Sequence, residues 1–176
     1  MNREDVFIQR DLNCSPLVTN LLAQKYGDVE IEILEHGIVE ANYYISKRLG
    51  VPLTSRVYCS SELVRVGNHP IAYNKYYIDM EQLMDLEDKE YTSFDLYRLI
   101  SEKKNINYMT TKEEMLIVNA NETEKKYLEL TDEEEILLYK GLVSFEGEDR
   151  IFEYFESSNI STLYRIRSVG NNGSGN

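Results

Sequence analysis

The chain has 176 residues, 42% of them apolar and 28% charged, which is typical of one globular domain with a sizeable core. Its net charge of −12 disfavours direct binding of DNA or RNA, because phosphate contacts need clustered Lys and Arg. No apolar run approaches the length of a membrane span, and the charged N-terminus lacks the apolar region of a secretion signal. We therefore expect a cytoplasmic protein with no membrane contact.

Helical and strand patterns alternate along the first half of the chain. Ser15-Pro16 is a typical helix start and Gly27 a typical helix end, so a helix is predicted between them. A half-buried strand is predicted over 29–35 and a helix over 41–49, where apolar residues recur every four positions. A long hairpin follows, with strands over 56–65 and 70–79 joined by a turn at Gly67.

The second half continues in the same way. A helix is predicted over 93–104, a less clearly patterned strand over 108–118, a helix from 120, a second long hairpin over 136–156 and a last strand over 162–169. This order predicts the α+β class with an antiparallel sheet and flanking helices. No linker rich in Pro and Gly divides it, so we expect one domain.

Two stretches of the chain resemble each other. Ala41-Asn42 begins a helix that is followed by a hairpin, and Ala120-Asn121 begins the same series 79 residues later. The sequence therefore predicts an internal helix-plus-hairpin repeat. Two copies of one unit usually pair about a pseudo-axis, and their junction is a natural place for a ligand pocket.

Signals for catalysis and for metal binding are weak. The two histidines, His36 and His69, fall beside a glycine and in a predicted turn, where exposure is the simplest interpretation. Cys14 and Cys59 have no metal-ligand spacing, so we expect reduced thiols, no metal and no cofactor.

Polar residues inside apolar strands are more informative. Glu62, Asn74 and Glu153 each lie within a predicted strand, and burying such groups is costly unless something pairs with them. Because strand residues alternate between faces, Glu62 and Val64 fall on one face, and Asn74 and Tyr76 can join them across the turn. This face is either one wall of a ligand pocket or simply wet.

The run from Leu49-Gly50-Val51-Pro52 to Gly67-Asn68-His69-Pro70-Ile71-Ala72-Tyr73 resembles the UTRA domain, the effector-binding part of HutC-type GntR bacterial regulators. The resemblance covers residues 11–169. It implies a chorismate-lyase-like fold, a small-molecule pocket and a homodimer. In this family a winged helix-turn-helix precedes the domain and binds DNA; we expect none within this chain, and a disordered tail over 170–176.

The resemblance also implies the effector-binding residues, taken position by position. The matching or neighbouring positions are Glu62, Val64, Asn74, Tyr76, Ser93, Asp95, Tyr97, Glu153 and Tyr164. Many relatives that respond to sugar phosphates have an Arg-x-Arg pair where this chain has Glu62 and Val64. Acidic side chains at Glu62 and Asp95 repel phosphate. We therefore predict an effector without phosphate, such as a sugar, an amine or an amino acid derivative.

Two other functions remain open on the sequence alone. One is an enzyme of the chorismate-lyase type, although a dianionic substrate calls for cations that Glu62 and Val64 do not supply. The other is a dimerisation module with a vestigial pocket. The leading interpretation is a regulatory domain that is not an enzyme.

Overall fold

A six-stranded antiparallel sheet forms the centre of the protein. The structure, a computed structural model, describes residues 6–11, 22, 25–27, 29–82, 91–104 and 109–167. In spatial order the strands are β2 (Val29–Glu40), β3 (Arg56–Val66), β4 (His69–Asp79), β7 (Ile151–Ile160), β6 (Glu135–Phe145) and β5 (Met109–Asn119). The α+β class and the antiparallel sheet predicted from the sequence are confirmed.

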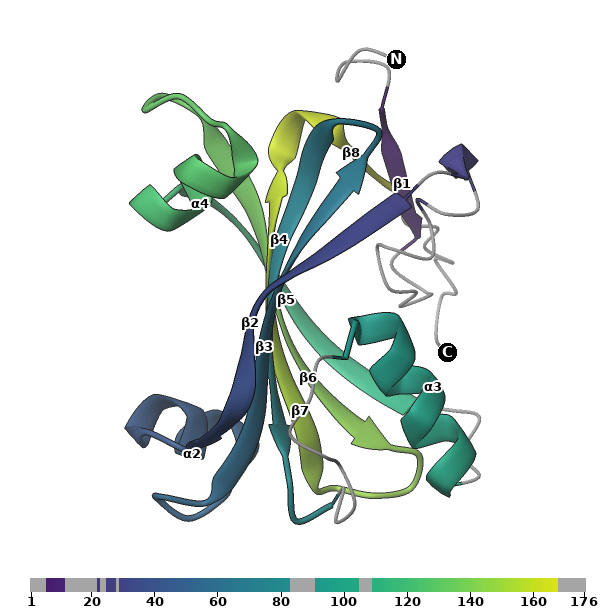
Figure 1. Cartoon of the computed structure of the whole chain (residues 1–176), viewed down its shortest axis with the longest axis vertical. Helices are drawn as coiled ribbons and strands as arrows, with labels where there is room; N and C mark the ends of the chain where they lie inside the picture. Colours follow the sequence, from purple (N-terminus) through teal and green to yellow (C-terminus); the bar gives the residue numbers. More distant parts are fainter. Residues whose placement is uncertain are drawn as a thin grey trace, which may run out of the picture.

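Helices cover both faces of this sheet. On one face lie α2 (Tyr43–Leu49) and α4 (Glu122–Leu128), and on the other lies α3 (Ser93–Lys104) (Figure 1). The α3 side also carries a small parallel pair made of β1 (Ile8–Asp11) and β8 (Tyr164–Arg167), the latter preceded by the 3₁₀ turn η2 (Ser161–Leu163).

The predicted repeat is present in three dimensions. Helix α2 leads into the hairpin β3–β4, α4 leads into the hairpin β6–β7, and the copies meet where β4 pairs with β7. Asn42 and Asn121 cap the two helices by accepting hydrogen bonds from backbone amides of the first turn. Both helices end in the left-handed conformation, at Gly50 (φ 69°) and at Glu129 (φ 56°).

Tyrosine contributes strongly to the core of this protein. Tyr58, Tyr139 and Tyr154 are among the largest fully buried side chains, and each lies on a central strand. Their rings add apolar area, while their hydroxyls bring polar atoms into the interior.

Some boundaries differ from the prediction. β2 runs on to Glu40 past an irregular pairing near Ile33, and β8 begins at Tyr164, after η2, rather than at Thr162. Strand β1 was not predicted; it pairs with β8 only through the tertiary fold, and Val6 and Ile8 are buried in the core. The packed body therefore begins before Asp11. Most of the helix predicted between Ser15 and Gly27, and the tail 170–176, lie outside the described residues.

Among the helices that the structure describes, none is both long and apolar enough to span a bilayer.

Candidate functional site

A row of buried polar side chains crosses the α3-facing side of the sheet. In the strand register Glu62 lies opposite Asn74, Asn74 opposite Ser157, and Ser157 opposite Tyr139. All four residues are buried, and Glu62 and Tyr139 are 0% exposed. The row spans β3, β4, β7 and β6, so both copies of the repeat contribute to it. Such burial demands hydrogen-bond partners.

A chain of hydrogen bonds fixes part of this row. Ser157 Oγ donates to Asn74 Oδ1 at 2.6 Å. Asn159 Nδ2 donates to the carbonyl oxygen and Oγ of Ser157 at 2.7 and 2.9 Å, and its Oδ1 accepts from the Tyr164 hydroxyl. This series of hydrogen bonds therefore links β4 and β7 to β8 and holds the Asn74 side chain in one orientation.

Glu153 is a fully buried carboxyl group on this face with a strongly perturbed pKa. It is 0% exposed, and its Oε1 accepts a hydrogen bond from the Tyr97 hydroxyl of α3 at 2.9 Å. Burial raises the pKa of Glu153 to about 8, the Tyr97 hydrogen bond opposes this rise, and the nearby Glu62 adds to it. Burial also raises the pKa of Tyr97 well above its ordinary value, so that hydroxyl remains a donor.

The second oxygen of Glu153 has an unused capacity for hydrogen bonding among the described residues. Oε2 is buried and has no hydrogen-bond partner among the described residues. When Glu153 is protonated this carboxyl group can donate a hydrogen bond to a ligand oxygen, and when it is ionised it can hold a cation. A buried carboxyl group that can change state near neutral pH is a typical feature of a binding site.

The structure brings most of the sequence-predicted site residues to this one face. Glu62, Asn74 and Glu153 lie there, joined by Tyr76, which is buried and close enough to Tyr97 to influence its pKa. The remaining aligned positions that reach this face are Val64, which packs in the apolar core, Tyr97 from α3 and Tyr164 from β8.

Asp95 lies apart from this polar row. Its backbone amide donates to Thr92 Oγ1 at 3.1 Å, the Thr92 hydroxyl donates back to Asp95 Oδ2 at 2.7 Å, and Arg98 donates to Oδ1 at 3.2 Å. These contacts tie Asp95 to the first turn of α3, where its carboxylate supports the helix start. Ser93 begins α3, but its side chain is outside the described part of the structure.

Sequence reasoning missed one cation on this face. Arg10 of β1 is 3% exposed, donates to Glu113 Oε2, and lies with its guanidinium carbon 4.2 Å from the centre of the Tyr139 ring. Its alternation with Val6 and Ile8 could have indicated a buried position. Since Glu113 pairs with Arg10, this guanidinium does not supply an uncompensated positive charge.

The site has no features of a metal centre. Among the described residues, no three His, Cys, Asp or Glu side chains are grouped to hold a metal ion.

Residues 25–164 match the family model of the UTRA domain. The chain belongs to the UTRA family. This confirms the resemblance seen in the sequence, and the fold is the chorismate-lyase-like fold expected from it. A comparison with curated protein sequences gave no match.

Solved structures agree with this assignment. PhnF from Mycobacterium smegmatis is 15% identical, with a TM-score of 0.76, covering 95% of this chain and 73% of that one. A GntR-family transcriptional regulator from Bacillus cereus is 18% identical, with a TM-score of 0.67 and coverage of 81% and 99%. The ligand-binding domain of a proposed GntR-family regulator from Bordetella bronchiseptica is 18% identical, with a TM-score of 0.68 and coverage of 82% and 92%. At these identities the likeness shows the fold.

Proposed function

We propose that this UTRA domain binds a small-molecule effector on the α3-facing side of its sheet. The observation that carries the proposal is the buried Glu153 carboxyl group, which Tyr97 holds through one oxygen while the other lacks a hydrogen-bond partner among the described residues. A protein seldom buries such a group without a use for it. Asn74, oriented by Ser157, adds a second polar contact in the same row.

The effector carries no phosphate in this proposal. Glu62 and Glu153 are both fully buried on this face, and Arg10 is already paired with Glu113. A phosphate placed here would find no uncompensated cation among the described residues of the row. An unphosphorylated sugar, an amine or an amino acid derivative matches the row of carboxyl, amide and hydroxyl groups.

We further propose that the domain acts as the regulatory part of a HutC-type GntR transcription factor and forms a homodimer in the cytoplasm. DNA binding would belong to a winged helix-turn-helix outside this chain. The effector would bind one arrangement of the dimer more tightly than another and so change the spacing of the attached DNA-binding parts.

The proposed function is not enzymatic. An enzyme of the chorismate-lyase type must neutralise a dianionic substrate, and the described residues of the row supply no uncompensated cation for that. A dimerisation module with a vestigial pocket would have no reason to keep Glu153 buried beside Tyr97.

A thermal-shift screen tests this proposal. The chain is heated with neutral sugars, amines and amino acids, and with the phosphorylated form of each sugar. A ligand present at a hundred times its Kd stabilises the folded state by about 2.7 kcal/mol, which raises Tm by roughly 5–11 °C for a domain of this size. We expect such a rise with an unphosphorylated compound. Stabilisation by phosphorylated sugars alone would refute the proposed effector class.

A further inference from the structure

The row formed by Glu62, Asn74, Ser157 and Tyr139 is called the effector row below. The opposite face of the sheet contains a hollow of its own. It measures about 380 Å³ and lies where the middle of β3 and β4 meets α4, with part of β2 beside it. The residues that line it include Ser61, Tyr73, Lys75, Lys126 and Tyr127. Because strand residues alternate, Ser61 and Lys75 are chain neighbours of Glu62 and Asn74 but point to the other face. The hollow and the effector row therefore lie on opposite faces of the same strands.

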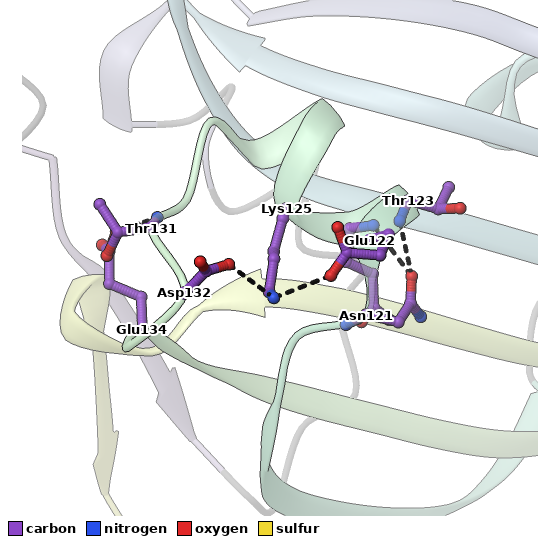
Figure 2. A network of polar contacts seen from close by, with 8 residues as sticks. Asn121, Glu122, Thr123, Lys125, Thr131, Asp132 and Glu134 are labelled. Carbon is purple, nitrogen blue, oxygen red and sulfur yellow. Dashed lines mark hydrogen bonds and ion pairs between the residues drawn. The ribbon is translucent and has the colours of Figure 1, made fainter.

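Helix α4 is held firmly over this hollow. Asn121 and Glu124 form a reciprocal cap at its start, and the buried Glu124 carboxylate also accepts a hydrogen bond from Ser158 of β7 at 2.6 Å. Figure 2 shows Lys125 between Glu122 and Asp132. Lys125 Nζ lies 2.9 Å from Glu122 Oε1 and 2.9 Å from Asp132 Oδ1. The Ser158 contact ties this short helix to the sheet, whereas Lys125 pairs with residues of α4 and of the loop that follows it.

Two lysines in the hollow lack the acidic partners that Lys125 has. Lys126 Nζ lies 5.3 Å from the ring centre of Tyr127, and Lys75 Nζ lies 5.4 Å from that of Tyr73. Neither lysine forms an ion pair within the described part of the chain. Glu35 is the only acidic side chain among the described residues that line the hollow, so two lysines and one glutamate face it.

Two stacked tyrosine rings and a serine hydroxyl also line the hollow. The rings of Tyr73 and Tyr127 stack with centres 5.1 Å apart at an angle of 25°. Ser61 is 5% exposed, and its Oγ has no hydrogen-bond partner among the described residues. This hydroxyl is close enough to Tyr73 to oppose the burial-driven rise of the Tyr73 pKa, but the two groups are not in hydrogen-bond geometry.

We propose that this hollow is a second ligand site, which takes a small aromatic anion. The acid group of the ligand, a carboxylate or a phosphate, pairs with Lys75 and Lys126, and its flat body packs against the tyrosine rings. The Ser61 hydroxyl gains the partner that it lacks. The volume is within the usual range for small-molecule pockets, about 300–1,000 Å³. This site is separate from the effector row, because it lies on the other face of the sheet.

An NMR titration of the whole ¹⁵N-labelled chain tests the site. The probes are sodium benzoate, phenyl phosphate and, as an uncharged control, benzyl alcohol. We expect saturable shifts of the amide signals of Ser61, Tyr73 and Tyr127 with at least one anion and not with benzyl alcohol. Comparing benzoate with phenyl phosphate shows which acid group is preferred.

Matched variants separate the site from a general charge effect. Lys126→Gln should weaken binding of the anion at least tenfold, whereas Lys125→Gln, which removes a lysine already paired with two carboxylates, should leave it unchanged. Equal losses in both variants, or equal binding of benzyl alcohol, would overturn the proposal. So would sedimentation data in which Lys126→Gln separates a dimer without affecting anion binding, since a second copy of the chain would then cover this face.

Discussion

The buried Glu153 predicts an unusual dependence of stability on pH. Its pKa lies at about 8 in the folded protein, against an ordinary value of 4.5. Between these two values the folded state keeps a proton that the unfolded chain releases, so the free energy of unfolding falls as pH rises. At about 1.4 kcal/mol per pH unit the full loss has a ceiling of about 5 kcal/mol, reached above pH 8.

Replacing the carboxyl group with an amide should remove this dependence. Glu153→Gln keeps the shape of the side chain and an oxygen for the Tyr97 hydroxyl, but it cannot ionise. At pH 5 we expect the free energy of unfolding of the variant to be within about 1 kcal/mol of that of the parent. At pH 8.5 we expect it to be higher by about 2–4 kcal/mol, which is less than the ceiling of about 5 kcal/mol because the protein relaxes around the charged carboxylate.

Urea unfolding followed by circular dichroism at pH 5, 6, 7, 8 and 8.5, at constant ionic strength, measures this difference. Glu148→Gln, which alters an exposed carboxylate in the turn between β6 and β7, is the matched control and should show no pH-dependent difference from the parent. A Glu153→Gln curve that stays parallel to that of the parent across the range would show that Glu153 is not buried as an acid of raised pKa.

Three further substitutions test the packing that positions the two faces. Gly141→Ala should lower the free energy of unfolding by about 1–3 kcal/mol in urea unfolding, because its Cβ would lie 2.2 Å from the Phe155 ring; an unchanged midpoint would refute that contact. Ser158→Ala should cost about 1–3 kcal/mol by the same assay, since the buried Glu124 carboxylate loses a donor, and a loss no larger than that of an exposed Ser→Ala change would contradict this. Glu129→Gly should raise the free energy of unfolding by up to about 1 kcal/mol, and with it Tm, because the backbone at this position is left-handed (φ 56°). A lower Tm in thermal unfolding would argue against backbone strain at Glu129.

The repeat and the position of Glu62 and Asn74 could be predicted from the sequence. Both follow from local rules: the Asn caps and helical spacing mark each unit, and the two-residue period of a strand decides which side chains share a face. The cross-strand pairing of Glu62 with Asn74 does not follow from the turn alone, because an irregularity between Val64 and Arg65 shifts the register by one residue.

The features that could not be predicted from the sequence depend on contacts between residues far apart in the chain. Arg10 reaches the row only because β1 pairs with β8, more than 150 residues later in the chain. The pairing of Tyr97 with Glu153 depends on how α3 packs on the sheet, and Asp95 is held by Thr92 and Arg98 at the helix start. The hollow beside Lys126 exists only where α4 of one repeat meets the hairpin of the other.

Isothermal titration calorimetry of the Tyr97→Phe variant tests the proposed effector site most directly. The titrant is the unphosphorylated compound that gives the largest rise in Tm in the screen, and Lys126→Gln on the opposite face is the control. Loss of the hydroxyl that holds Glu153 should weaken binding about tenfold, or about 1.4 kcal/mol, while the control binds as the parent does. Unchanged affinity in Tyr97→Phe, with affinity lost in Lys126→Gln, would place the effector on the other face and contradict the account.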